Sequence, residues 1–141
     1  MQKIEFTFHD RAPVLGERRK LKAFIEKLFS IEGKALTSLS YVFCSDSYLL
    51  GINNEFLNHD YYTDIITFDL SPADTGTEAE VYISVDRVRE NARKLKATGK
   101  EELHRVIFHG ALHLCGYKDK KKGDILIMRE KEEEYLKKYF G

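Results

Sequence analysis

The sequence carries no net charge, has no long apolar run, and contains only two cysteines in 141 residues. The zero net charge gives no long-range attraction toward a polyanion, so any contact with nucleic acid must depend on local groups. The two cysteines, Cys44 and Cys115, are too few for a disulfide framework and indicate reduced thiols. No stretch approaches the roughly 20 apolar residues that span a bilayer, and the first residues lack the apolar centre of a signal peptide. We therefore expect a cytoplasmic protein with no membrane partner.

Apolar residues are spaced along the whole chain as they are in strands and amphipathic helices. Alternating patterns predict strands near residues 4–8, 39–43, 65–68 and 81–83. Patterns with a 3.6-residue period predict helices over residues 13–33, 46–56, 84–98, 101–115 and 124–139. The length suits one domain over residues 1–141. We predict an α+β fold in which a small mixed four-stranded sheet is covered by about five helices.

Particular residues are expected to mark the ends of these helices. Pro13 would open the first helix, and Asp46 would cap the second. Gly99, after Thr98, would stop the third helix, and Asp124 would cap the last. These positions set the expected boundaries.

The predicted helix at residues 101–115 contains the residues with the clearest chemistry. His109 and His113 are the only strongly polar side chains after Arg105, so both imidazoles should be buried and need partners. They project roughly 40° apart, one turn above the other, as two ligands of one metal ion do. His104 lies more than about 100° away on the same helix and is not expected to join them.

Two glycines and an aspartate extend this pattern. Gly110, inside the helix, suggests close approach of another backbone or of substrate. Gly116 is placed to cap the helix and turn the chain back, so that Asp119 returns toward the histidines. The spacing His-x3-His-x2-Gly-x2-ligand is that of the metzincin zinc proteases, and three protein ligands with an open fourth position are typical of catalytic zinc. We predict a zincin-like helix with one Zn²⁺ per chain, held by His109, His113 and Asp119.

Other interpretations of this segment are weaker. A structural zinc site would need four Cys or His ligands, whereas this region has one cysteine. A protease with the His-Glu-x-x-His motif uses the glutamate as its base, and Gly110 occupies that position, which argues against peptide hydrolysis. Cys115 projects roughly 160° from both histidines, and Asp124 is expected to serve as a cap, so neither replaces Asp119.

These motifs resemble those of the YbeY family, bacterial zinc-dependent endoribonucleases that act in ribosomal RNA maturation. The family pattern His-Gly-x-Leu-His-Leu-x-Gly-Tyr-Asp-His compares with HGALHLCGYKD at residues 109–119. A second pattern, Leu-Asn-x-x-Tyr-Arg-x-x-Asp-x-Pro-Thr-Asp-Val-Leu-Ser-Phe, compares with INNEFLNHDYYTDIITF at residues 52–68. The segment EVYISVDRV at residues 80–88 resembles the strand and helix of the family, and the similarity extends over residues 41–128.

The chain departs from the family pattern at several positions. Asp119 replaces the third histidine ligand, and Lys118 replaces the aspartate before it. Aspartate is a competent zinc ligand, so the resemblance still implies a metal site. Leu57 replaces an arginine that the family uses in RNA cleavage, and Tyr62 replaces a proline.

The resemblance implies a single-strand-specific endoribonuclease that acts in ribosomal RNA processing and ribosome biogenesis, with the small ribosomal subunit as a partner. Thr63 and Asp64 match the family; they either begin a strand or line the active cleft, where RNA would lie along residues 63–68. No general base is evident. Two alternatives stay open: a non-catalytic, zinc-stabilised ribosome-assembly factor, which Leu57 favours, and a metalloprotease. The cleavage site, the attacking group and the oligomeric state are not predicted.

Charged residues gather in three segments, at residues 87–100, 118–122 and 130–134. The first two are basic and are expected to be mainly solvated surface, although both would suit an RNA backbone. The third is acidic and is expected to be solvated surface alone.

Overall fold

The computed structural model describes residues 3–141 and shows a four-stranded mixed sheet with helices, which confirms the predicted α+β fold. The strands are β1 (Ile4–Phe8), β2 (Leu36–Cys44), β3 (Ile65–Asp69) and β4 (Thr77–Ser84). The helices are α1 (Arg18–Ile31), α2 (Asp46–Leu57), α3 (Val85–Leu95), α4 (Gly99–Leu114) and α5 (Lys122–Phe140). The elements follow one another in the predicted order.

The strands are ordered β1-β2-β4-β3 across the sheet. The first three run parallel, and β3 pairs antiparallel with β4 at one edge. Parallel neighbours place Tyr41 of β2 between Phe6 and Val81, and these side chains face the main core. Alternation along β3 sends Ile65 toward that core and Ile66 toward the other face.

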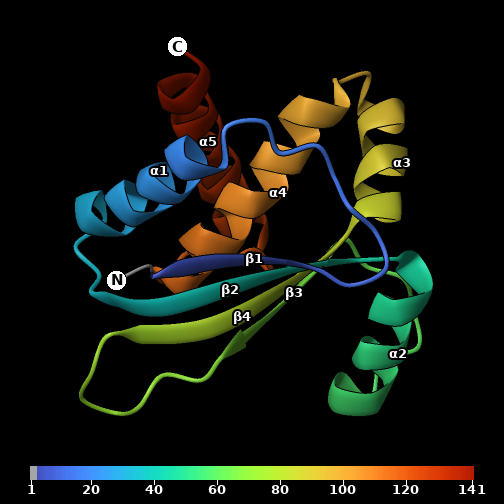
Figure 1. The fold of residues 1–141 in the computed structure, drawn as a ribbon, viewed down its shortest axis with the longest axis horizontal. Helices are drawn as coiled ribbons and strands as arrows, with labels where there is room; N and C mark the ends of the chain where they lie inside the picture. Colours follow the sequence, from blue (N-terminus) through green and yellow to red (C-terminus); the bar gives the residue numbers. More distant parts are fainter. Residues whose placement is uncertain (1–2) are drawn as a thin grey trace.

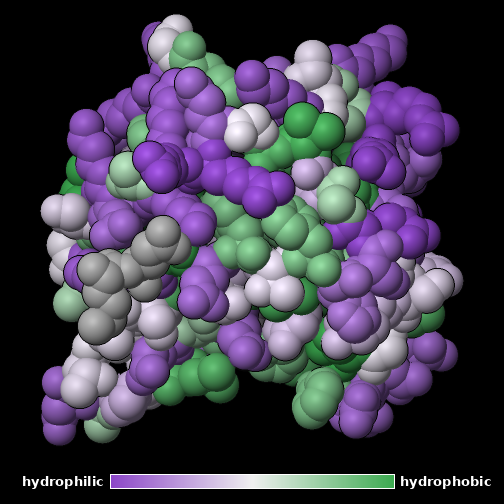
Figure 2. Space-filling view, in the orientation of Figure 1, coloured by the Kyte–Doolittle hydropathy of each residue, from purple (hydrophilic) through white to green (hydrophobic). Residues whose placement is uncertain are grey.

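Helices α1, α3, α4 and α5 lie on one side of the sheet, and α4 passes over it between the others (Figure 1). The hydroxyl of Tyr41 donates to the carbonyl of Ile107 at 2.9 Å, which joins α4 to the middle of the sheet. Helix α2 packs on the opposite face, where Leu49 and Ile52 form a second apolar cluster with Ile66. The face shown in Figure 2 is largely polar, with apolar side chains gathered near its centre.

Gly110 lets α4 approach the sheet closely. A Cβ atom at this position would lie 3.0 Å from Cδ1 of Ile65 and 3.1 Å from Cγ1 of Val81. The expectation that another backbone or substrate approaches this glycine is therefore wrong, because the close neighbours are side chains of β3 and β4. This close packing brings α4, which carries His109, against β3.

Several helix boundaries differ from those expected. Helix α1 begins at Arg18 rather than at Pro13. Ser45, not Asp46, caps α2, and its hydroxyl accepts from the Tyr48 amide at 3.2 Å. The carboxylate of Asp46 is instead engaged by Arg87, whose Nη2 lies 2.7 Å away. Asp46 thus joins α2 to α3 through an ion pair and does not cap α2.

The junctions around α4 and α5 also differ. Helix α3 ends at Leu95, its C-cap Lys96 takes a left-handed conformation with φ 56°, and Gly99 already belongs to α4. Thr98 caps α4 by accepting from the Glu101 amide at 3.0 Å. Asp124 lies in the first turn of α5 and is not its cap. No helix in residues 3–141 has both the length and the apolar character that a membrane span requires.

Candidate functional site

The turn after α4 brings Asp119 back to the histidine helix. Gly116 has φ 110°, and its amide donates to the His113 carbonyl at 3.0 Å. The next amide, of Tyr117, donates to the Leu112 carbonyl at 3.1 Å. This pair of bonds is a Schellman motif, which reverses the chain at the end of a helix. The predicted glycine turn is confirmed, and it places Oδ2 of Asp119 3.1 Å from Nε2 of His109.

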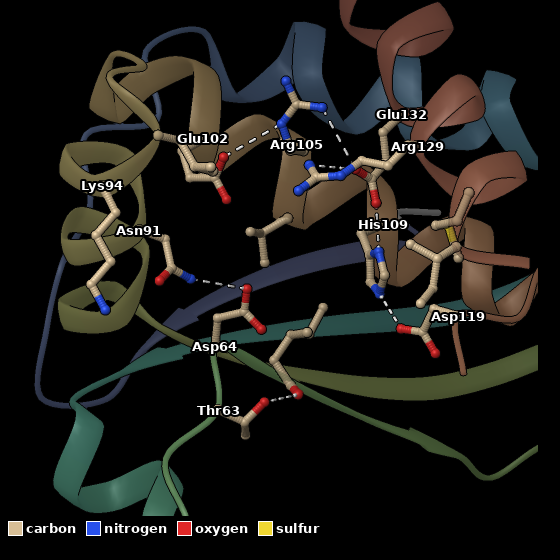
Figure 3. Close-up of a pocket in the computed structure, with 15 residues that line it drawn as sticks. Thr63, Asp64, Asn91, Lys94, Glu102, Arg105, His109, Asp119, Arg129 and Glu132 are labelled. Carbon is tan, nitrogen blue, oxygen red and sulfur yellow. Dashed lines mark hydrogen bonds and ion pairs between the residues drawn. The ribbon is translucent and has the colours of Figure 1, made fainter. Parts of the chain in front are cut away.

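The two nitrogens of His109 face different carboxylates (Figure 3). Nδ1 lies 2.6 Å from Oε2 of Glu132, and Nε2 faces Asp119. Burial alone would lower the pKa of His109, but the hydrogen bond and charge of Glu132, together with Asp119, raise it above its usual value. A carboxylate on Nδ1 keeps a proton on that nitrogen, so Nε2 is the atom left to bind a cation.

His113 lies on the same side of α4 but is exposed, so the expectation that both imidazoles are buried is wrong. Its side chain lines a cavity of about 300 Å³ together with His109 and Asp119. Leu57, which occupies the position of the family arginine, lines the same cavity. Within residues 3–141, no three His, Cys, Asp or Glu side chains come close enough together to hold an ion. The structure thus joins two of the three predicted ligands and places the third on the wall of their cavity.

The donor chemistry of this cavity suits a zinc ion. Two imidazoles and a carboxylate are among the ligands that zinc prefers, and three such ligands leave one position open. Oriented by a buried carboxylate on its far nitrogen, His109 has the arrangement that is typical of histidine ligands of metals. The residues present therefore fit the ion that the sequence predicts.

Glu132 is a residue of the candidate site that the sequence analysis missed. It was expected to belong to a solvated acidic run, but its residue exposure is only 4 %. Arg105 and Arg129 stand 3.6 Å and 3.5 Å from its Oε1. A signal for it exists in the sequence, because Glu132 falls on the same stripe of α5 as the buried Met128 and Tyr135. A carboxylate within an apolar stripe indicates a buried partner.

Thr63 and Asp64 precede β3 and lie beside the histidine helix. Both line a second cavity, of about 520 Å³, which shares His109 and Asp119 with the first cavity. The Nδ2 amide of Asn91 donates to Oδ2 of Asp64 at 3.5 Å. Burial raises the pKa of Asp64 above its usual value. The position of these residues agrees with the interpretation that they line a cleft.

The remaining sequence candidates lie elsewhere. His104 is a core histidine, buried and bonded through Nδ1 to the Lys100 carbonyl at 2.7 Å, and it does not join the site, as expected. Cys115 is buried in the main core, and burial raises its pKa to about 12. Among the basic segments, Lys94 lines the larger cavity and Lys120 the smaller one.

Comparisons with known proteins show the family of this chain. The family model described as endoribonuclease YbeY matches residues 7–140. A protein named endoribonuclease YbeY from Porphyromonas gingivalis is 51 % identical over 96 % of this chain and 89 % of its own length. Another with that name, from Cytophaga hutchinsonii, is 45 % identical over 94 % of this chain and 93 % of its own length.

A solved structure has a similar fold over most of its length. The solution structure of a Thermotoga maritima protein aligns with a TM-score of 0.64 and 28 % identity, covering 98 % of this chain and 89 % of the other. The family match spans the turn at Gly116, the histidines and the segment before β3. The chain belongs to the endoribonuclease YbeY family.

Proposed function

We propose that this protein is a zinc-dependent endoribonuclease that cleaves single-stranded RNA during ribosomal RNA maturation in the cytoplasm. One zinc ion per chain would be held by His109, His113 and Asp119. The observation that carries the proposal is the position of His109, whose Nδ1 is bonded to buried Glu132 while Nε2 faces Asp119. The names of the relatives support RNA as the substrate.

The chain contributes orientation and charge to the reaction. The chemistry that zinc supplies when bound is Lewis acidity, which offsets the negative charge that develops on a phosphate. Glu132 holds the His109 ring in one tautomer, and Arg105 and Arg129 hold Glu132 in turn. Thr63 and Asp64 line the larger cavity on the other side of His109, where the strand on one side of the cleaved bond would lie.

The chain has no net charge, but individual cations near the proposed metal site would attract an RNA backbone. Lys94 and Arg129 are exposed and line the larger cavity, while Lys120 lines the smaller one. These cations lie on both sides of the proposed metal site, so an RNA backbone that crosses it would meet a positive group in each direction. Ribosomal RNA within the small ribosomal subunit is the proposed substrate and partner.

One observation favours a second function. Leu57 lines the smaller cavity, and as an apolar residue it offers no contact to a phosphate. A protein that keeps the metal site but has leucine where the family pattern has arginine would suit a ribosome-assembly factor that binds RNA without cutting it. The two functions differ in whether the phosphodiester bond is broken.

The test is a cleavage assay on labelled single-stranded RNA with zinc-loaded protein. The unsubstituted protein should cut the RNA and hold about one zinc per chain. His109→Ala should lose both properties, whereas His9→Ala, which removes an exposed imidazole outside both cavities, should keep them. Zinc content without cleavage would favour the assembly factor, and casein digestion that follows zinc content would point to a protease. A 2′,3′-cyclic phosphate at the new end would identify the ribose hydroxyl as the nucleophile.

A further inference from the structure

The larger cavity, of about 520 Å³, extends well beyond the residues of the proposed metal site. It lies between α3, α4, α5 and the segment before β3, and it meets the proposed metal site at His109 and Asp119 (Figure 3). Asp64, Asn91 and Glu102 border it on the side away from Asp119. A group that enters here would therefore be next to the atoms bound at the metal site.

The charges of this cavity are separated into a rim and a floor. Lys94 and Arg129 are exposed cations at the rim. The floor carries the buried guanidinium of Arg105 and three carboxylates that outnumber it, those of Asp64, Glu102 and Glu132, of which the last two are 4 % exposed. A phosphate on the floor would be repelled by these carboxylates, whereas a neutral group with N–H donors would be attracted. The rim suits the phosphates on either side of such a group.

The floor also has three buried polar atoms that make no hydrogen bond within residues 3–141, namely Oε1 of Glu102, Oε1 of Glu132 and Nη1 of Arg105. Oε1 of Glu102 stands 3.4 Å from Nε of Arg105. Nη1 of Arg105 stands 3.6 Å from Oε1 of Glu132 and is likewise without a hydrogen bond. Buried polar atoms of this kind are costly, so a polar ligand that reaches the carboxylate and the guanidinium they belong to would be favoured here.

Apolar side chains complete the walls. Ile65 and Val106 line the cavity from the sheet side and from α4, and Met128 lines it from α5. A flat ring would have apolar surface against its faces and polar atoms at its edge, which is the usual arrangement of a small-molecule pocket.

We propose that this cavity binds one unpaired nucleobase of the RNA strand, with an N–H of the base directed to the Glu102 carboxylate and an adjacent ring nitrogen or carbonyl directed to the Arg105 guanidinium. The proposal rests on the proposed function, because the strand that supplies the base is the one cleaved at the metal site. Proteins read single-stranded RNA by inserting unstacked bases into such pockets. A paired base has its Watson–Crick edge occupied by its partner, so the pocket would also select single-stranded RNA.

The test measures binding of labelled single-stranded RNA octamers by fluorescence anisotropy, with gels to confirm that the strands stay intact. The octamers form a scan in which each position in turn is made abasic. With the unsubstituted protein, removal of the base at one position should weaken binding roughly 10-fold. Glu102→Gln turns an acceptor into a group that also donates, so it should change the preferred base at that position. Glu130→Gln makes the same change on an exposed part of α5 outside this cavity and should not change it.

The outcomes separate this proposal from the proposed function. If every abasic strand binds within twofold of its parent, the pocket is refuted even where zinc-dependent cleavage is found. If one position matters and Glu102→Gln changes its preference, the pocket is supported even where cleavage is absent. The scan needs no substitution in the protein, so a failure of Glu102→Gln to fold leaves it decisive. If a nucleoside monophosphate displaces the labelled strand, free nucleotides are ligands of the same pocket.

Discussion

Oε2 of Glu132 lies 2.6 Å from Nδ1 of His109, although the two residues are 23 positions apart and belong to different helices. The bond crosses the interface between α4 and α5, so the orientation of the proposed metal ligand depends on how these helices pack. Arg105 of α4 faces the same carboxylate from the other side, with Nη1 3.6 Å from Oε1. Glu132 thereby links the charge network of the interface to the metal site.

Substitution of Glu132 should weaken metal binding without touching a ligand. Glu132→Leu removes the acceptor for Nδ1 and should lower zinc affinity by roughly 10- to 100-fold. Glu132→Gln keeps an acceptor oxygen, so His109 should keep its tautomer, and affinity should fall less. Competition with a chelator measures the affinity, and ¹⁵N chemical shifts of the imidazole report the tautomer.

The matched control for these variants is Glu130→Leu, which removes an exposed carboxylate from the same helix. It should leave zinc affinity unchanged. Equal affinities for Glu132→Leu and Glu130→Leu would show that the bond to His109 has no effect on metal binding. Glu132→Leu should also lower stability, since the buried Arg105 would lose one of its carboxylate partners, so affinity must be measured on folded protein.

Gly110→Ala should destabilise the protein, whereas Gly51→Ala should not. Alanine gains up to about 1 kcal/mol over glycine in a helix interior. At Gly110 the new methyl would stand 3.0 Å from Cδ1 of Ile65, and overpacking of this kind costs about 1–3 kcal/mol. At Gly51, in α2, a Cβ meets nothing within 4 Å, so only the gain remains. Urea unfolding of both variants gives the comparison, and a stabilised Gly110→Ala would contradict it.

Glu32 should make part of the stability depend on pH. Burial raises the pKa of Glu32, but hydrogen bonds from Tyr135 and Tyr117 and the charge of Lys131 outweigh it and hold the pKa below its ordinary value of 4.5. A depressed folded pKa adds stability above the unfolded pKa, and this stability is lost as the pH falls through the folded value. Tyr135→Phe removes one donor, so it should cost about 2 kcal/mol at pH 7.

The cost of Tyr135→Phe should shrink as the pH is lowered below 4.5, because the protonated Glu32 gains less from its donors. Unfolding free energies measured between pH 3 and pH 7 test this. Tyr139→Phe is the control, since the Tyr139 hydroxyl makes no hydrogen bond in the described part of the chain. A cost of Tyr135→Phe that is the same at every pH would show that Glu32 is not responsible.

The parts of the site that depend on local geometry could be predicted from the sequence. The helix period places His109 and His113 on one side of α4, and Gly116 reverses the chain so that Asp119 meets His109. Each of these relationships spans ten residues or fewer, so turn and helix geometry alone are enough.

The parts of the site that depend on packing between distant elements could not be predicted from the sequence. The partner of His109 comes from α5, and nothing in the local pattern shows which carboxylate of that helix is buried. The exposure of His113 depends on how much of α4 the neighbouring elements cover, which is set by tertiary packing. The same holds for the cap of α2, where Arg87 of α3 competes for Asp46 and Ser45 takes its place.

Leu57→Arg should strengthen binding to RNA. The side chain lines the smaller cavity beside His113 and Lys120, so an arginine there would add a contact to a phosphate. The logarithm of the binding constant should then fall more steeply with the logarithm of the salt concentration, by about one unit of slope. Leu70→Arg adds the same charge at an exposed position outside this cavity and should change the slope less. Equal slopes for the two variants would remove residue 57 from the RNA path.

Asp119 should prove to be the third metal ligand. Its Oδ2 already stands 3.1 Å from Nε2 of His109, and the Gly116 turn holds it there. Nearby alternatives are poor, since Cys115 is buried in the core and Asp124 lies in the first turn of α5.

Two substitutions at Asp119 test this assignment. Asp119→Ala should lower zinc affinity at least about 10-fold, because even the loss of an outer partner costs that much. Asp119→His should keep or raise the affinity, since it supplies a nitrogen ligand that zinc prefers at the same place in the turn. Asp124→Ala is the control and should bind zinc as the unsubstituted protein does. Chelator competition on the three variants decides the matter: an Asp119→Ala protein that holds zinc as tightly as Asp124→Ala would mean that the carboxylate faces His109 only as a hydrogen-bond partner.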